Sequence, residues 1–256
     1  MDWSRKITLK KPAEIAIMRE AGRINATVHA TIREMLKPGV TTYELDAAAE
    51  KVLGQFGCVS PFKGYGFPPF PNSITVSINE ELVHGIPSKT RRLAEGDIVS
   101  IDCGTYYQGY VADSAFTAGV GEISDLAKRL LEVTEGALFA GIEKMRPGYM
   151  TGDVSEAIQK FVEGNGFHVT REYTGHGVGK QMHEGPQVPN HGEGGTGMLL
   201  QPGLVIALEP MVLVGTHRTK VGKDNWTVVS ADRSLTAHFE HSIAVTEGEP
   251  LILTVL

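Results

Sequence analysis

The sequence predicts a mixed α/β (α+β) protein in which two similar halves, roughly residues 10–120 and 121–250, pack as a single domain spanning 1–256. Three observations support this prediction. Each half starts with two helical patterns separated by a Pro-Gly break, at Pro38-Gly39 and at Pro147-Gly148, 109 positions apart. Each half then continues into short β-branched runs. A hydrophobic content of 41% over 256 residues is enough for one core that both halves share.

The first half opens with a predicted helix that begins at Pro12, a residue suited to the first helical turn. Apolar residues recur every three or four positions up to Met35, which is the spacing of one helix face. Thr41 and Glu44 then form the pattern of a capping box. A second helix is therefore expected to run from there to Gly57.

A loop and a strand are expected after these helices. Residues 61–71 are too rich in Gly and Pro for a regular element, and they predict a loop that carries aromatic side chains. Residues 74–78 predict a strand. This strand leads to the Val-His-Gly-Ile-Pro segment at 83–87.

The chain then predicts two antiparallel strands, each with an acidic residue in an otherwise apolar run. The runs 98–103 and 110–116 flank a predicted turn over 104–109, and they carry Asp102 and Asp113. A buried carboxylate without a partner costs several kcal/mol or loses its charge. A single buried Asp is usually satisfied by Arg or by backbone amides. Two on neighbouring strands, with no basic residue between them, indicate a shared divalent cation.

The second half repeats this plan. A helix is expected over 124–145, and the helix after it aligns with the second helix of the first half, since Thr151 corresponds to Thr42. Further on, the alignment continues at an offset of 107 positions, and there Asp102 corresponds to Glu209. The two halves are thus expected to present acidic side chains to a common centre.

The last predicted strand, 235–245, carries Glu240 in an apolar setting, as the first half carries Asp113. Four acidic residues are therefore expected at one centre: Asp102, Asp113, Glu209 and Glu240. Four carboxylates repel one another unless cations lie between them, and two divalent ions would balance their charge. Such a pair lowers the pKa of a bridging water towards about 7, which suits hydrolysis of an amide or a phosphoester. No cluster of Lys or Arg accompanies the acids to hold a phosphate, so an amide substrate is favoured.

An imidazole ligand is available among the nine histidines. His176 stands between glycines that let the backbone approach a ligand, and His183 follows seven positions later. Oxygen ligands with one imidazole suit Mn, Fe, Co or Zn. His241 is expected to point away from its neighbour Glu240. The other unused histidines are expected to be ordinary hydrogen-bonded side chains without an acidic strand partner: His29, His168, His191, His217 and His238.

Composition argues against several classes of protein. A net charge of −6 with interspersed signs gives no basic footprint for nucleic acid. The N-terminal sequence has no apolar run typical of a signal peptide, and the most apolar region, 198–214, is interrupted by two prolines and Glu209. Only Cys58 and Cys103 occur, which argues against a disulfide scaffold or a thiolate zinc site. We therefore expect a cytoplasmic protein without membrane contact.

Together these residues resemble type I methionine aminopeptidase of the minimal bacterial kind. The five expected ligands occur in the family's order: Asp102, Asp113, His176, Glu209 and Glu240. The motifs that carry the resemblance are Val83-His84-Gly85-Ile86-Pro87, Gly175-His176-Gly177-Val178-Gly179, His183-Glu184, Asp224-Asn225-Trp226-Thr227 and Phe239-Glu240-His241. The resemblance covers roughly residues 7–254. It implies the pita-bread fold, two pseudo-two-fold related αβ halves around a mostly antiparallel curved sheet.

The resemblance also implies a role for each ligand in a dinuclear centre. Asp113 and Glu240 would bridge two divalent ions of Co, Mn, Fe or Zn. Asp102 would chelate one ion, and His176 with Glu209 would hold the other. The implied activity is hydrolytic removal of the initiator methionine from nascent polypeptides at the ribosome, with a small second residue preferred.

Three residues would act on the substrate directly, as the resemblance implies. Glu209 would be the general base that helps to take a proton from the attacking water. His183 would donate a hydrogen bond to the scissile carbonyl and the tetrahedral intermediate. His84 would contact the scissile amide nitrogen. The free α-amine of the substrate would sit on the Asp102 metal, which explains why only the first residue is removed.

The implied methionine pocket is lined by rings and soft side chains: Phe62, Tyr65, Phe70, Thr75, His84, Met182, His183 and Trp226. Such a wall suits an unbranched thioether. The sequence departs from the family in that Thr75 stands where Cys is common, Met182 stands where Phe is frequent, and the stretch 65–75 is longer than usual. A monovalent cation, Na or K, is implied near Asn79, Glu81 and Thr236.

Two alternative functions fit part of this pattern. An Xaa-Pro aminopeptidase shares the fold but typically has a large extra N-terminal domain, whereas the first helix here begins by Pro12. A non-catalytic relative that binds peptides or RNA usually loses ligands, whereas this chain keeps all five as well as His84 and His183. A type II enzyme would need a helical insertion for which the spacing from His183 to Glu240 leaves no room. We expect a monomer that acts on peptides, without nucleic-acid specificity.

Overall fold

The structure is a computed structural model that describes residues 6–256. The helices are α1 (Pro12–Met35), α2 (Thr42–Gln55), α3 (Asp125–Ile142) and α4 (Thr151–Gly164). The strands of the first half are β1 (Ile74–Ile78), β2 (Glu81–Val83), β3 (Ile98–Tyr107) and β4 (Tyr110–Gly119). The remaining strands are β5 (His168–Val169), β6 (Thr174–Gly177), β7 (Glu184–Pro189), β8 (Val205–Leu208), β9 (Met211–Leu213), β10 (Thr219–Val221), β11 (Val228–Ser230), β12 (Thr236–His238), β13 (His241–Ala244) and β14 (Leu251–Ile252).

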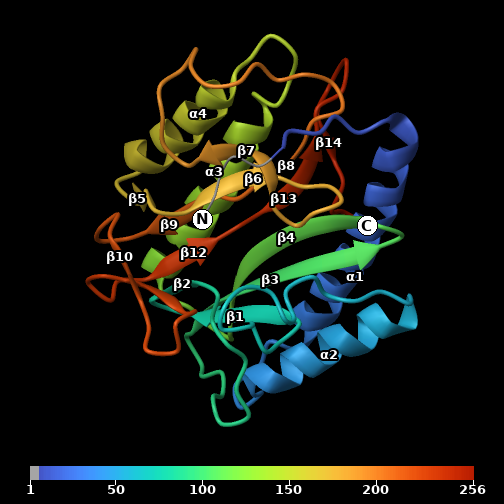
Figure 1. Cartoon of the computed structure of the whole chain (residues 1–256). Coiled ribbons are helices and arrows are strands. Elements are labelled where there is room, and N and C mark those ends of the chain that lie inside the picture. Colours follow the sequence, from blue (N-terminus) through green and yellow to red (C-terminus); the bar gives the residue numbers. More distant parts are fainter. Residues whose placement is uncertain (1–5) are drawn as a thin grey trace.

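The strands form four small sheets in which the named ladders are antiparallel. Their orders are β1-β3-β4, β10-β11-β2, β12-β9-β5 and β14-β13-β8-β6-β7. Figure 1 shows α1 and α2 beside the first of these sheets, and α3 and α4 beside the strands of the second half. The predicted mixed α/β class is confirmed. The division into halves of roughly 10–120 and 121–250 stays a prediction.

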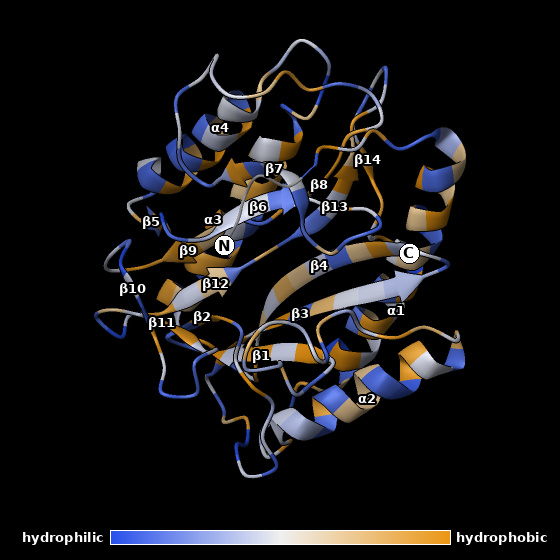
Figure 2. Ribbon diagram, in the orientation of Figure 1, coloured by the Kyte–Doolittle hydropathy of each residue, from blue (hydrophilic) through white to orange (hydrophobic). Residues whose placement is uncertain are grey.

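One apolar core extends through both halves. It includes Ile24 and Val28 of α1 and also Leu130 of α3 and Ile158 of α4, all of which are buried. Figure 2 shows hydrophobic and hydrophilic residues alternating along the helices, as expected when one helix face is buried and the other is in water. The helices therefore pack their apolar faces against the sheets, and their polar faces are in water.

The predicted helix starts are confirmed by their caps. The side chain of Thr41 accepts a hydrogen bond from the Glu44 N–H at 3.2 Å, and the Glu44 carboxylate accepts one from the Thr41 N–H at 2.7 Å. Ser124 caps α3 in a similar way through the Ala127 N–H. The helix expected over 124–145 ends earlier, at Ile142, and continues only as turns.

The predicted turn over 104–109 is too long. Strands β3 and β4 continue to the pair Tyr107 and Tyr110, so the turn consists of Gln108 and Gly109, both with positive φ. Gly104 lies within β3, where a Cβ atom would meet the Pro61 ring at 2.7 Å. This glycine is needed for close packing of the 61–71 loop and not for a turn.

The strand expected over 235–245 is interrupted. It forms β12 and β13, which pair with β9 and β8 in two different sheets. Glu240 lies at the break and pairs with Ala115 of β4. Glu209 lies at the matching break between β8 and β9. The acids of the second half therefore stand at strand ends and not inside continuous strands.

Asp46 of α2 fixes the start of β1. Its buried carboxylate accepts hydrogen bonds from Asn72 Nδ2 at 2.6 Å, the Ser73 N–H at 2.8 Å and the Ile74 N–H at 3.2 Å. Asp46→Ala is expected to lower the free energy of unfolding by about 3 kcal/mol, because buried donors lose their acceptor. Denaturant unfolding measures this loss, and the exposed Glu247→Ala variant serves as control. A loss below about 1 kcal/mol would contradict the prediction.

Membrane insertion through a helix finds no support between residues 6 and 256. Within that range no helix has the length and apolar character needed to cross a bilayer.

Candidate metal centre

The β3–β4 hairpin places two acids on one face of its sheet. Asp102 lies opposite Ala115, and Asp113 lies opposite Gly104. Because cross-strand partners and residues two apart share a face, both carboxylates leave the sheet on the same side. The side chain of Ser242 fixes this part of β4, since it accepts a hydrogen bond from the Asp113 N–H at 2.9 Å and donates one to the Asp113 carbonyl at 2.8 Å.

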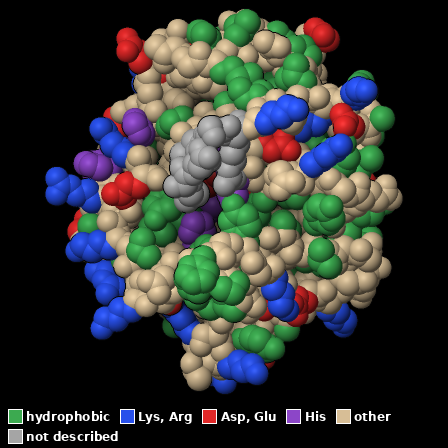
Figure 3. Space-filling model, in the orientation of Figure 1, with side chains coloured by type: hydrophobic (Ala, Val, Ile, Leu, Met, Phe, Trp, Pro, Cys, Tyr) green, Lys and Arg blue, Asp and Glu red, His purple; other side chains and the backbone are tan. Residues whose placement is uncertain are grey.

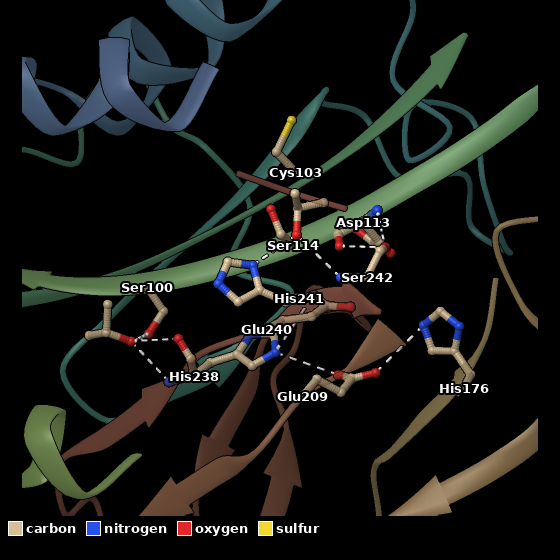
Figure 4. A network of polar contacts seen from close by, with 12 residues as sticks. Ser100, Cys103, Asp113, Ser114, His176, Glu209, His238, Glu240, His241 and Ser242 are labelled. Atoms are coloured by element: carbon tan, nitrogen blue, oxygen red, sulfur yellow. Dashed lines mark hydrogen bonds and ion pairs between the residues drawn. The ribbon is translucent and has the colours of Figure 1, made fainter. Parts of the chain in front are cut away.

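The second half brings its expected ligands close to Asp113. The Glu240 N–H donates to the Ala115 carbonyl at 2.9 Å, which ties the β12–β13 break to β4. His176 of β6 pairs with Ala207 of β8, just ahead of Glu209. One ligand atom from each of three buried residues then lies within 4.8 Å of the others: Asp113, His176 and Glu240. Figure 4 shows this convergence, with Glu209 beside His176.

The carboxylates of the cluster are buried close together, an arrangement that bound cations would stabilise. Burial raises the pKa of Asp113 to about 7, and burial together with neighbouring carboxylates raises the pKa values of Asp102 and Glu240 well above their ordinary range. Burial and Asp113 raise the pKa of Glu209 likewise. Among these acids, Asp102 Oδ1, Asp113 Oδ1 and Glu240 Oε1 are buried without a hydrogen-bond partner from the described residues. Buried oxygens of this kind with a nearby imidazole fit divalent metal ions.

His238 is a site residue that the sequence interpretation missed. It was expected to have no acidic partner, and this expectation is wrong. Its Nε2 lies 3.5 Å from Glu209 Oε2 and 4.0 Å from Glu240 Oε2, as Figure 4 also shows. Burial lowers its pKa to about 3, so the ring is neutral. Its spacing of two residues before Glu240 was the available signal, because alternate residues of a strand share a face.

Both histidines expected to act on the substrate lie beside the cluster. The ring of His183 is 4.3 Å from that of His176, centroid to centroid, and its Nδ1 lies 2.8 Å from the hydroxyl of Tyr65. His84 follows β2 with a φ of 61°, in the left-handed region where strain often marks a functional residue. Burial lowers the pKa of His84 to about 4. His241 is not part of this group of residues, and its ring forms a hydrogen bond with Thr254.

One cavity joins the acids to the expected methionine pocket. Its lining includes every residue predicted for the site: Phe62, Tyr65, Phe70, Thr75, His84, Asp102, Asp113, His176, Met182, His183, Glu209, Trp226 and Glu240. It also includes residues that were not predicted: Val83, Glu172, Tyr173, Thr174 and Met211. Figure 3 shows His side chains in the middle of this face, bordered by hydrophobic side chains. The arrangement offers an apolar recess that ends at the acidic cluster.

Trp226 contacts the 61–71 loop. The indole Nε1 donates to the Pro68 carbonyl at 3.0 Å, and the ring meets Phe70 edge-on with centroids 5.2 Å apart. Gly66 allows this contact, because a Cβ atom there would lie 2.6 Å from the indole. Phe67 of this loop is 98% exposed, while Phe70 is buried at the cavity wall.

Comparison with known proteins agrees with the geometry. Residues 16–247 match the model of metallopeptidase family M24. The chain is 51% identical to methionine aminopeptidase 1 of Bacillus subtilis over 97% of this chain and 99% of that protein. It is 48% identical to the methionine aminopeptidase of Clostridium acetobutylicum, over 97% and 99%. The crystal structure of methionine aminopeptidase from Thermotoga maritima aligns with a TM-score of 0.96 at 43% identity, covering 98% of this chain and 100% of that one. The expected pita-bread fold is confirmed.

Proposed function

Since the chain belongs to metallopeptidase family M24, we propose that it is a methionine aminopeptidase that removes the initiator methionine from the N-termini of nascent proteins. The observation that carries this proposal is the cavity in which an apolar recess ends at buried acids and at His176. A preference for a small second residue is part of the proposal. The identity to methionine aminopeptidases extends over nearly the whole chain, and this favours their substrate class. Two prolidases, an Xaa-Pro dipeptidase and an X-Pro aminopeptidase resemble the chain at only 21–24% identity.

The protein binds divalent metal, and we propose that five residues form a dinuclear site. Asp113 and Glu240 would bridge the ions, Asp102 would chelate one, and His176 with Glu209 would hold the other. Buried oxygens of Asp102, Asp113 and Glu240 have no hydrogen-bond partner among the described residues, which supports this set. When bound, such ions supply Lewis acidity and a hydroxide at neutral pH. Co, Mn, Fe and Zn all suit these donors.

The chain's own residues then handle the protons and the substrate. Glu209 lines the cavity and would take a proton from the attacking water. When the Tyr65 hydroxyl donates to Nδ1 of His183, the proton of that ring resides on Nε2, which can donate to the carbonyl oxygen of the scissile bond. His84, neutral because its pKa is about 4, would contact the scissile nitrogen.

The recess suits the side chain of methionine. Phe62, Phe70, Met182 and Trp226 give it apolar and polarisable walls, which favour an unbranched thioether. The metal-bound α-amine would limit cleavage to the first residue.

The test measures hydrolysis of Met-Gly-Ser and of Leu-Gly-Ser peptides by protein loaded with Co or Mn. We expect release of free Met, little release of Leu, and complete loss of activity after treatment with a chelator, with recovery when the metal is added back. The free amino acid is measured by chromatography. Equal activity in the chelated protein, or equal release of Leu, would contradict the proposal.

Three finer points belong to the same proposal. A monovalent cation, Na or K, would bind near Thr236, whose Oγ1 lies 3.0 Å from the Asn79 carbonyl and 2.9 Å from the Glu81 carbonyl. The protein would work as a monomer at the ribosome. A cytoplasmic location is supported by Cys58 and Cys103, which are both free thiols.

A further inference from the structure

A short segment before α1 contacts the loop that carries His183 through a β-bridge and an ion pair. Ile7 forms a bridge with Gly185, and the Gly185 N–H donates to the Lys6 carbonyl at 3.4 Å. Lys10 Nζ lies 2.8 Å from Glu184 Oε2, an ion pair between residues 174 positions apart. We call residues 6–10 the N-terminal strap.

The ion pair is buried and well bonded. Lys10 and Glu184 are each 6% exposed. The Thr8 hydroxyl donates to the same carboxylate, and the Gln181 N–H donates to its other oxygen at 3.2 Å. Burial raises the pKa of the Glu184 carboxyl, but hydrogen bonds from Lys10 and Thr8 outweigh it and hold that pKa below its ordinary value. Gly179 packs closely against this pair, because a Cβ atom there would lie 2.5 Å from Lys10 Cε.

This pair acts on the backbone next to His183. Glu184 is the first residue of β7 and contacts Thr8 and Lys10 of the strap. His183 directly precedes it, in a bend, and lines the cavity. The ladder of β6 and β7 shifts register between His176 and Gly177, where Gly177 faces Glu184. Such an irregularity can redirect nearby side chains, and the strap contacts lie on this same segment.

We propose that Lys10, acting through Glu184, is a positioning residue that holds His183 at the scissile carbonyl. The inference rests on the proposed function, since it assigns His183 to the reacting carbonyl. The Tyr65 hydroxyl contacts the His183 ring, and the strap contacts the next residue, Glu184. A displaced hydrogen-bond donor weakens stabilisation of the transition state more than binding of the substrate.

The decisive variant removes both charges at once, Lys10→Met with Glu184→Gln, so that no unpaired charge stays buried. We expect kcat for Met-Gly-Ser to fall by roughly 10- to 100-fold with KM within about twofold. Lys10→Arg, which keeps the charge, should retain more of kcat than the double variant. Thr8→Val leaves the ion pair in place, so its loss of kcat should be smaller than that of Lys10→Arg. In a His183→Ala background the double substitution should change kcat by less than about twofold, since the donor it positions is absent.

Val162→Ala in α4 is the stability control, because it creates a small buried cavity at a residue that lines neither the cavity nor the strap contacts. It should lower Tm without changing kcat. An unchanged kcat in the double variant would overturn the inference, and so would an equal loss of kcat with or without His183. If the unmodified protein released no Met, the proposed function itself would fail, which is a separate result.

Discussion

Glu209→Gln is expected to lower kcat for Met release by about 10²–10⁴-fold, the usual contribution of a general base. The amide has nearly the same shape as the carboxylate and fits between His176 Nε2 and His238 Nε2, each 3.5 Å from a Glu209 oxygen. It cannot accept the proton of the attacking water. Steady-state kinetics with Met-Gly-Ser, at saturating Mn or Co, measures the loss.

Folding of this variant can be checked separately. Replacing one of several buried carboxylates by an amide removes like-charge repulsion, so Tm of the metal-free protein should not fall. The exposed Glu193→Gln variant is a matched control and should keep full activity. Metal affinity, measured by calorimetry, should decrease in Glu209→Gln and stay unchanged in Glu193→Gln. If Glu209→Gln kept full activity at saturating metal, Glu209 would be neither general base nor essential ligand.

His183→Ala is expected to lower kcat by about 10²–10³-fold with a much smaller change in KM, as for other donors to an oxyanion. The ring lies 4.3 Å from His176, centroid to centroid, at the wall of the cavity. Its donor should therefore contact the carbonyl oxygen as negative charge develops there. Single-turnover measurements separate this chemical step from product release.

Two variants sharpen this test. Tyr65→Phe removes the hydroxyl 2.8 Å from His183 Nδ1 and should reproduce part of the loss, because the ring then loses a partner that fixes its tautomer. His191→Ala, a half-buried histidine outside the cavity lining, should behave as the unmodified protein. A rise in KM at unchanged kcat would show that His183 serves only to bind substrate.

Local patterns were sufficient where the physics is local. The capping box at Thr41 and the start of α1 at Pro12 depend on residues within one turn, and both agree with the structure. The acids Asp102 and Asp113 share a face because strands alternate with a period of two, whatever lies around them.

Local patterns failed where two distant segments decide the conformation. Gly104 was expected in a turn, yet it stays in β3 because Pro61 packs against it. The run 235–245 looked like one strand, yet it divides at Glu240 because its two ends belong to different sheets. His238 was overlooked for the same reason, since its acidic neighbour Glu209 lies on another segment.

The sequence by itself determined the fold class, the order of the acidic and histidine side chains proposed as ligands, and the chemistry that such side chains can perform, because these depend on residue type and short-range periodicity. Only the tertiary structure decided how Glu209 and Glu240 reach the centre from strand ends, and that Lys10 meets Glu184 across 174 positions. The physical reason is that burial and pairing are set by the whole packed core, in which a residue's neighbours are chosen by space and not by chain position.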